Sequence, residues 1–211
     1  MTSPPPATRR ERNRTRTRRA LVDAALELCA SDGFEAVSVD RIADAAGVSP
    51  RTFFRYFPTK DEVLFADYED EFDVWSIVTA AHVPGETVLD CIRRGTHQVA
   101  ADYLARQEHW DRWFGVVAAD PVLQRRFLAA RARLQQRAAA AIGRMLGIDP
   151  SLDPRPTALA AAAMATTDAA LRIWEASGRT RPRLEVVDEA LDGLLELTPL
   201  LASPTRPPAP S

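Results

Sequence analysis

The sequence is poor in cysteine and has no long apolar run, and each absence excludes a class of protein. Two of its 211 residues are cysteine, and neither Cys29 nor Cys91 belongs to a Cys-x-x-Cys or Cys/His motif. Zinc ribbons, iron–sulfur clusters and disulfide-stabilised folds are therefore not expected. No apolar run reaches the roughly 18 residues that a membrane-spanning helix needs.

Motifs for secretion and for catalysis are missing as well. The N-terminus is rich in proline and arginine and has no apolar core, so it does not resemble a secretory signal. There is no Glu-x-x-His pair for a di-metal site, no glycine-rich phosphate loop and no Gly-x-Ser-x-Gly elbow. We therefore expect a cytoplasmic protein that is not an enzyme, and that binds neither a metal, a cofactor nor a membrane.

Lysine is scarce too, because Lys60 is the only lysine and every other basic side chain is arginine. The net charge of −2 hides an uneven distribution. Residues 1–60 carry 11 basic and 7 acidic side chains, whereas residues 61–211 carry 16 and 22. Seven arginines lie between Arg9 and Arg19. A basic head on an acidic body is typical of a chain that meets nucleic acid at one end only.

What the sequence does contain is helix-forming residues. Ala, Leu, Arg and Glu dominate, and alternating β-branched runs are absent. We predict an all-α protein of about nine helices, divided into a basic disordered tail at 1–14, a small helical domain at 15–60, a larger helical domain at 61–200, and a disordered tail at 201–211. The predicted helices run from about Thr15 to a stop at Gly33, then over 38–46 and 49–57, then from Thr59, and over 86–106, 108–118, 121–146, 157–177 and 184–200.

The second and third predicted helices have the pattern of a helix-turn-helix. Ser38 and Ser49 can cap them, and Pro50 occupies a first position where a missing N–H costs nothing. Gly47 permits a positive φ in the turn. The second helix of such a pair enters the major groove, and the first lies across the DNA backbone. We expect a small core beneath them, made of Val39, Ile42, Ala43, Val48, Phe53 and Phe57.

The arginines before the first helix fit the same interpretation. A flexible basic arm at Arg9–Arg19 can meet phosphates or a minor groove. The alternative is a solvated tail that binds nothing, which is common for charge runs.

The segment from Gly33-Phe34 to Lys60 carries a detailed resemblance to a known family. Its motifs are Val39-Asp40-Arg41-Ile42-Ala43, Ala46-Gly47-Val48-Ser49 and Thr52-Phe53-Phe54-Arg55-Tyr56-Phe57-Pro58-Thr59-Lys60. This segment resembles the DNA-binding domain of tetracycline-repressor-type (TetR) regulators. The resemblance implies that residues 15–60 form a three-helix DNA-binding domain and that the protein is a homodimer that binds a palindromic operator. It also implies that residues 61–200 form a multi-helix domain for dimerisation and for binding a small ligand.

The resemblance also implies roles for single residues. Arg51 would read a base, because a guanidinium can bridge guanine O6 and N7. Phe54 stands where the family most often has Tyr, and can touch a thymine methyl. Lys60 matches a lysine that binds phosphate at the start of the fourth helix. The alternative for Arg41 and Arg55 is a surface ion pair with Asp40, Asp44 or Glu62. The full predicted DNA-binding set is Ser38, Arg41, Ser49, Arg51, Thr52, Phe54, Arg55, Tyr56 and Lys60.

The C-terminal part offers candidates for an effector pocket and for a dimer interface. Ordinary packing within the protomer is the alternative for every one of them. The pocket candidates are Phe72, Trp75, His97, Tyr103, Trp110, Trp113, Phe114, Met164, Thr167 and Asp168. The interface candidates are Leu159, Ala163, Leu171, Trp174, Leu191, Leu194 and Leu195.

The seventh predicted helix carries six arginines, which make either a solvated face or a phosphate site. A faint resemblance of Phe53–Lys60 to the mycofactocin-regulator-like branch favours an acyl-coenzyme A as the phosphate-bearing ligand. The arginines are Arg125, Arg126, Arg131, Arg133, Arg137 and Arg144.

These observations predict a ligand-responsive transcriptional regulator. We expect a repressor that binds double-stranded DNA as a homodimer and that a small, largely apolar effector releases. The alternative is an architectural DNA-binding protein without an effector, whose binding would be insensitive to sequence and steeply weakened by salt.

Overall fold

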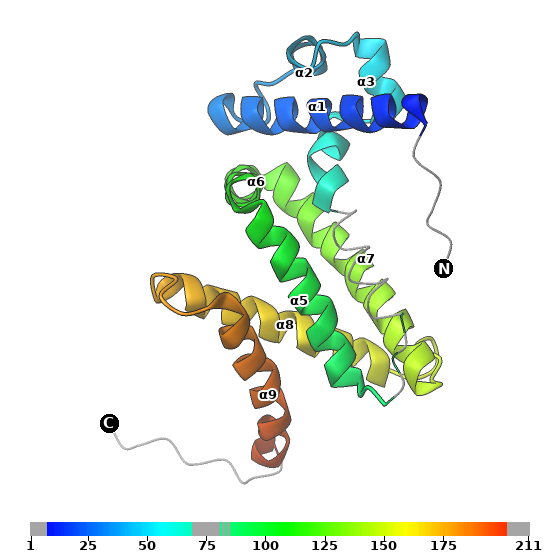
Figure 1. Ribbon diagram of the computed structural model, residues 1–211, viewed down its shortest axis with the longest axis vertical. Helices are drawn as coiled ribbons and strands as arrows, with labels where there is room; N and C mark the ends of the chain where they lie inside the picture. The colour runs from blue at the N-terminus through cyan, green and yellow to red at the C-terminus, as the bar shows by residue number, and fades with distance from the viewer. Residues whose placement is uncertain (1–7, 69–80, 82, 84, 202–211) are drawn as a thin grey trace. The chain divides into compact units, whose positions relative to one another are not determined.

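The computed structural model describes residues 8–68, 81, 83 and 85–201, and every regular element within these ranges is helical (Figure 1). The prediction of an all-helical protein is therefore confirmed. Residues 60–68 are helical too, and they lie between α3 and α5 along the chain. The helices with both ends described are α1 (Arg9–Asp32), α2 (Val39–Ala45), α3 (Pro50–Tyr56), α5 (Val88–Ala105), α6 (Gln107–Ala119), α7 (Pro121–Leu146), α8 (Arg155–Ala176) and α9 (Arg183–Leu201).

The helix-turn-helix forms through the caps that the sequence predicts. The Ser38 side chain accepts from the Arg41 N–H at the start of α2, and the Ser49 side chain accepts from the Thr52 N–H at the start of α3. Gly47 has a φ of +68°, a conformation that costs glycine little. The turn between α2 and α3 is therefore set by local sequence.

The first helix begins at Arg9, so the predicted start near Thr15 is wrong. Residues 9–14 are helical, although the sequence prediction assigns them to a disordered tail. No proline or glycine lies between Thr8 and Leu21, and arginine favours the helix. The prediction starts the helix close to its first apolar residues, but backbone hydrogen bonding continues further, up to the bond from the Arg12 N–H to the Thr8 carbonyl.

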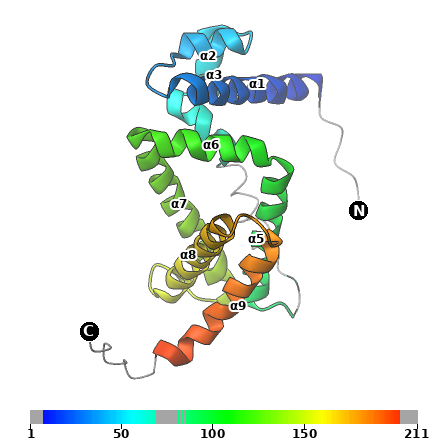
Figure 2. The same ribbon diagram turned by 90° about the vertical axis from the view of Figure 1, so that its left-hand side faces the viewer.

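The described residues fall into two compact units. The first contains α1 to α3, the helical residues 60–68, α6 and the first part of α7. Within this unit α2 and α3 lie on one side of α1 and α6 on the other (Figures 1 and 2). One continuous core runs from Leu21 in α1 to Leu123 in α7, with Phe53, Phe65 and Trp113 fully buried.

The second unit contains most of α5, the later part of α7, and α8 and α9, which pack against each other. Its core is small-residue rich, with Ala138, Ala160 and Ala163 beside Ile142 and Leu191. These units do not coincide with a division at residue 60, because α6 and α7 complete the core under the helix-turn-helix. No described helix is both long and apolar enough to cross a membrane.

Candidate DNA-binding interface and effector region

The first turns of α3 present a mixed basic and aromatic surface. Phe53 and Phe57 are buried beneath it, whereas Arg51 and Arg55 are exposed and Phe54 is 54% exposed. The Arg55 guanidinium lies 5.3 Å from the centroid of the Tyr56 ring, which is half-buried. An exposed phenylalanine in a basic surface has the chemistry to meet a thymine methyl next to phosphates.

The predicted hydroxyl contacts serve first as helix caps. Ser38 and Ser49 accept the hydrogen bonds described above, and the Ser49 and Thr52 hydroxyl oxygens lie 3.0 Å apart. A capping oxygen accepts through a lone pair and keeps its O–H for a second partner. These three side chains therefore stabilise the first turns of α2 and α3. A contact with a DNA phosphate would use a hydroxyl hydrogen that is not engaged in these bonds.

Arg41 forms a surface ion pair, which was the predicted alternative to a DNA contact, but its partner is Asp32 and not one of the predicted acids. Its guanidinium lies 2.5 Å from an Asp32 carboxylate oxygen, and a second nitrogen donates to the Ala36 carbonyl. The predicted partners Asp40, Asp44 and Glu62 are wrong, because Asp32 lies at the end of α1, where the side chain of Arg41 reaches it. Hydrogen bonds from Arg41 and then Ser31 lower the pKa of Asp32. Arg41 thus ties α2 to α1.

Lys60 is held by the protein's own backbone. Its ammonium donates to the Phe34 carbonyl at 2.7 Å and to the Val37 carbonyl at 2.9 Å, and lies 4.0 Å from the centroid of the Phe34 ring. Two of its three donors are therefore engaged with the loop between α1 and α2. These contacts attach the start of residues 60–68 to the helix-turn-helix. This structural role differs from the phosphate contact that the sequence predicts.

We expect Lys60→Met to loosen this fastening and to leave the salt dependence of DNA binding nearly unchanged. Losing hydrogen bonds from a charged group should lower the free energy of unfolding by about 1–3 kcal/mol. Urea unfolding and a salt titration of DNA binding measure the two effects. A phosphate contact would instead reduce the salt slope by about 0.9 per protomer with little effect on stability. Arg55→Met, on the exposed surface of α3, is the matched comparison and should follow that second pattern.

The helical residues 60–68 are joined to the neighbouring helices as well. Arg126 of α7 lies 2.8 Å from the Asp61 carboxylate, and the Trp113 indole of α6 donates to the Leu64 carbonyl at 2.6 Å. These contacts and Lys60 attach the helical residues 60–68 both to the helix-turn-helix and to α6 and α7. A shift of α6 or α7 would therefore reach the DNA-binding surface through this segment.

Asp67 makes further charged contacts between residues 60–68 and the neighbouring helices. Its carboxylate lies 3.5 Å from an Arg18 nitrogen, 2.5 Å from an Arg106 nitrogen and 3.6 Å from His109 Nε2. Burial, followed by the nearby Arg106 guanidinium, lowers the pKa of His109. The ring is therefore kept mainly neutral near pH 7. Asp67 holds the start of α6 against α1.

The aromatic pocket candidates of the first unit are found together. Trp113 is 1% exposed, stacks on Tyr68 with ring centroids 5.0 Å apart, and meets Trp110 edge-on at 5.7 Å. Phe114 lies beside Trp113 and is partly exposed, and the Tyr103 hydroxyl donates to Asp111. Trp110 and Trp113 are core residues, as the alternative interpretation holds. Phe72 and Trp75 lie outside the described residues.

The polar pocket candidates of the second unit have partners within it. His97 Nε2 lies 2.8 Å from an Asp188 carboxylate oxygen, which joins α5 to α9. The Thr167 hydroxyl donates to the Ala163 carbonyl one turn earlier, so it is satisfied within α8. Met164 and Asp168 are half-buried.

Most of the dimer-interface candidates pack inside their own protomer. Ala163, Trp174 and Leu191 belong to the buried core of the second unit. Leu159 and Leu171 pack against that core, Leu194 is half-buried, and the Leu195 side chain lies outside the described residues. The amphipathic pattern identified apolar faces correctly, but it cannot distinguish an intramolecular partner from a second copy.

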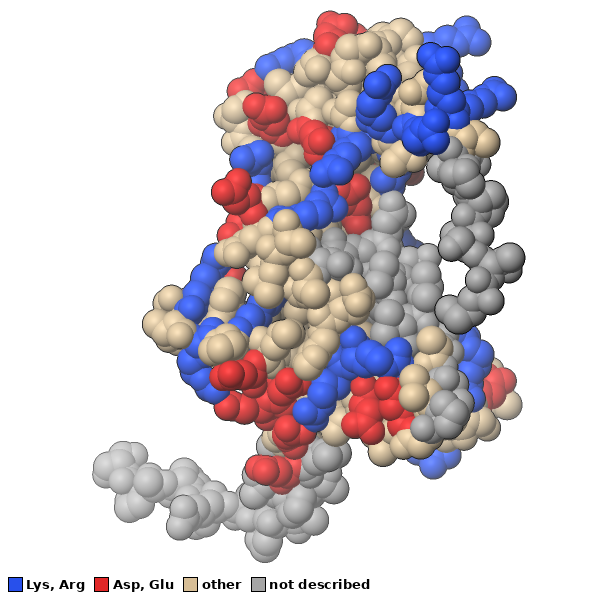
Figure 3. Space-filling view, in the orientation of Figure 1, with Lys and Arg blue, Asp and Glu red and all other residues tan. Residues whose placement is uncertain are grey.

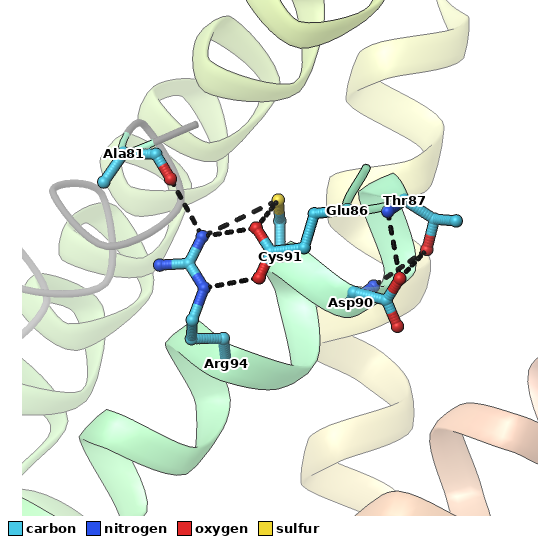
Figure 4. Close-up of polar contacts among 6 residues, drawn as sticks. All are labelled: Ala81, Glu86, Thr87, Asp90, Cys91 and Arg94. Atoms are coloured by element: carbon cyan, nitrogen blue, oxygen red, sulfur yellow. Dashed lines mark hydrogen bonds and ion pairs between the residues drawn. The ribbon is translucent and has the colours of Figure 1, made fainter. Parts of the chain in front are cut away.

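A polar cluster at the start of α5, drawn in Figure 4, was not predicted from the sequence. Arg94 donates to both Glu86 carboxylate oxygens at 2.8 Å and to the Ala81 carbonyl, and the Cys91 thiol donates to Glu86 at 3.0 Å. Burial and then the hydrogen bond to Glu86 raise the pKa of Cys91, which disfavours its thiolate form. Beside it Thr87 and Asp90 cap the helix reciprocally, a box that the Thr-x-x-Asp spacing could have revealed.

Comparisons with known proteins agree with this architecture. Residues 21–66 match the bacterial regulatory proteins of the tetR family, and residues 86–199 match the MftR C-terminal domain. The regulator TcmR of Streptomyces glaucescens is 28% identical over 213 residues, covering 94% of this chain and 90% of that protein. MftR of Mycobacterium tuberculosis, described as a mycofactocin biosynthesis regulator, is 46% identical over 57 residues, which cover 27% of this chain and 29% of that protein.

Solved structures share the fold. FadR of Thermus thermophilus in complex with lauroyl-CoA superposes with a TM-score of 0.56 at 24% identity, covering 92% of this chain and 99% of that one. The SmeT–triclosan complex gives a TM-score of 0.60 at 21% identity, covering 85% and 90%. The chain belongs to the tetR family of bacterial regulatory proteins, with an MftR-type C-terminal domain, and is a ligand-responsive transcriptional regulator, not an enzyme.

Proposed function

We propose that this regulator binds a palindromic operator as a homodimer and represses transcription until a small, largely apolar effector releases it. The observation that carries the proposal is the exposed start of α3, where Arg51 and Phe54 project from a rigid buried core. Arg51 would read guanine and Phe54 a thymine methyl in the major groove. Arg55, Tyr56, Ser38, Ser49 and Thr52 would contact the surrounding backbone.

The homodimer follows from the geometry of operators. Two recognition helices must reach half-sites about one DNA turn apart, which one protomer cannot do. We place the interface on the outer face of α8, because several of the predicted residues are committed to the protomer's own core. Ile173 on that face is 65% exposed, and Ala158 and Ala165 on the same face are exposed as well. Small residues beside one large apolar side chain suit close helix packing.

The effector class is inferred from the aromatic residues and from the basic face of α7. An apolar effector would contact the aromatic side chains that remain accessible, such as Phe114. Arg125, which belongs to the same unit as Phe114, is exposed and would suit the phosphates of an acyl-coenzyme A. Arg126 is committed to Asp61, and Arg131 lies over the Phe127 ring, so these two are less suited to a ligand. The FadR neighbour is a member of this fold in complex with lauroyl-CoA.

Release would act through the helical residues 60–68. A ligand that favours one of two arrangements of α6 and α7 shifts the population of the protomer between them. The contacts of Asp61, Leu64 and Asp67 would pass that shift to Lys60 and the helix-turn-helix. The distance between the two recognition helices of the dimer would then no longer match the operator.

Fluorescence anisotropy of a labelled duplex from the protein's own promoter region tests the proposal. Lauroyl-CoA, lauric acid and coenzyme A are added separately to the complex, together with any compound that native mass spectrometry finds on the purified protein. We expect an acyl compound or a co-purified compound to release the DNA, and coenzyme A alone to have no effect. Release by lauroyl-CoA but not lauric acid would support the phosphate contact. If no compound changes the anisotropy, the effector part of the proposal is wrong.

A further inference from the structure

The N-terminal turns of α1 lie outside the buried core of the first unit. Residues 9–16, called the basic segment below, contain five arginines and one glutamate. Its described side chains are all exposed, and the first buried residue of α1 is Leu21. Figure 3 shows basic side chains gathered where α1 begins. The basic segment is therefore a helix that contributes no side chain to that core.

Its electrostatics are unfavourable without a partner of opposite charge. Arg10 and Arg14 are four residues apart, a spacing at which like charges repel on a helix. Positive charge at a helix N-terminus also opposes the helix dipole. Further along, Arg18 and Arg19 already face carboxylates, those of Asp67 and Asp23. A polyanion would remove the repulsion that remains in the basic segment.

We propose that the basic segment is a second DNA-binding surface, which docks along the phosphates of DNA beyond the half-site read by α3. The inference rests on the proposed operator binding. The same helix continues into the core under α2 and α3, so its position relative to the recognition helix is fixed by packing. From Leu21 to Arg9 the helix extends about 18 Å, the length of roughly five base pairs. The surface carries no base-reading geometry, so it adds affinity without adding sequence preference.

DNA fits the segment better than an anionic membrane does. Helices that bind membrane surfaces insert an apolar face between the lipids. The basic segment, with the sequence Arg-Arg-Glu-Arg-Asn-Arg-Thr-Arg, has no apolar side chain. Its affinity for any partner is therefore electrostatic, and the nearest phosphates are those of the DNA bound by the same head.

The variant R10Q/R14Q/R16Q tests the assignment in the full chain. Glutamine has nearly the helix propensity of arginine, so the substitutions remove charge and repulsion while keeping the helix. Binding is measured against salt concentration with two duplexes, one ending two base pairs outside the selected operator and one extended by ten base pairs on each side. The matched control is R112Q/R155Q/R181Q, which removes the same charge from exposed positions elsewhere.

We expect the salt slope of the R10Q/R14Q/R16Q variant to fall by up to about 3 per protomer, at about 0.9 for each phosphate that the segment no longer neutralises. The wild type and the control should bind the extended duplex more tightly than the short one, and this variant should not. Hydrogen exchange of residues 9–16 should slow in the wild type only on the extended duplex. If the slope of the variant equals that of the control, or if the segment is protected only by phosphatidylglycerol vesicles, the assignment is wrong. If the wild type selects no operator at all, the proposed function fails instead.

Discussion

Trp113→Ala should lower the free energy of unfolding by about 3–5 kcal/mol, a large part of the stability of an ordinary domain. The Trp113 side chain is 1% exposed and contacts Phe65, Tyr68, Trp110 and Phe127 at once. The substitution leaves a cavity and removes the hydrogen bond to Leu64. Urea unfolding followed by far-UV circular dichroism measures the loss.

Its neighbour supplies the control. Phe114 is 42% exposed and contacts the rings of Trp113 and Phe127, so Phe114→Ala should cost much less, about 1 kcal/mol. Trp113→Phe should fall between the two, because it keeps most of the buried area and loses the indole donor. Equal midpoints for Trp113→Ala and Phe114→Ala would contradict the placement of Trp113 at the centre of this core.

Arg51→Ala should strongly reduce operator selectivity while the protein stays folded. Arg51 is exposed at the start of α3 and is not needed for packing. A bidentate contact to guanine is worth about 1–3 kcal/mol, and a dimer that uses it in both half-sites should lose about 2–6 kcal/mol of operator affinity. Affinity for random duplex should change little. Anisotropy titrations with operator and with scrambled DNA give both numbers.

Arg112→Ala serves as the comparison for Arg51→Ala, because it removes an exposed arginine from α6. It should leave the operator affinity within about 0.5 kcal/mol of the wild type. If Arg51→Ala weakens operator and scrambled DNA by the same factor, Arg51 contacts phosphate, and another side chain of α3 reads the base.

Local signals made the DNA-binding head predictable. Ser38, Ser49 and Pro50 act within one helical turn, and Gly47 acts at a single φ, so a short stretch of sequence specifies each feature. The inward position of Ile42, Phe53 and Phe57 follows from helical periodicity in the same way. Features that depend on one turn or one face can be read without a structure.

Contacts between distant segments could not be predicted. Lys60 reaches carbonyls 26 and 23 residues earlier, and Arg106 reaches Asp67 39 residues away. Nothing in the local sequence distinguishes Asp32 from Asp40 as the partner of Arg41. Residues 9–14 are helix-forming, but a run of charged residues is usually disordered. The sequence therefore predicted a disordered tail where the structure has a helix.

Aromatic residues illustrate the same limit for the effector region. The sequence offered Trp110 and Trp113 as pocket or core residues and Trp174 as an interface or core residue, and all three are buried. It could not separate a core residue from a pocket or interface residue, because all three roles require the same apolar face. The Trp174 indole donates to the Arg181 carbonyl and lies near two arginines, which commits it to its own protomer.

Selection of bound sequences from a random duplex pool tests the central claim most directly. The purified full-length protein is used, and the selected duplex is then titrated against scrambled DNA at fixed salt. We expect an inverted repeat to emerge, bound at least about a thousandfold more tightly than the scrambled duplex. A ratio near one, with binding that weakens steeply with salt for every sequence alike, would contradict operator recognition and indicate an architectural DNA-binding protein.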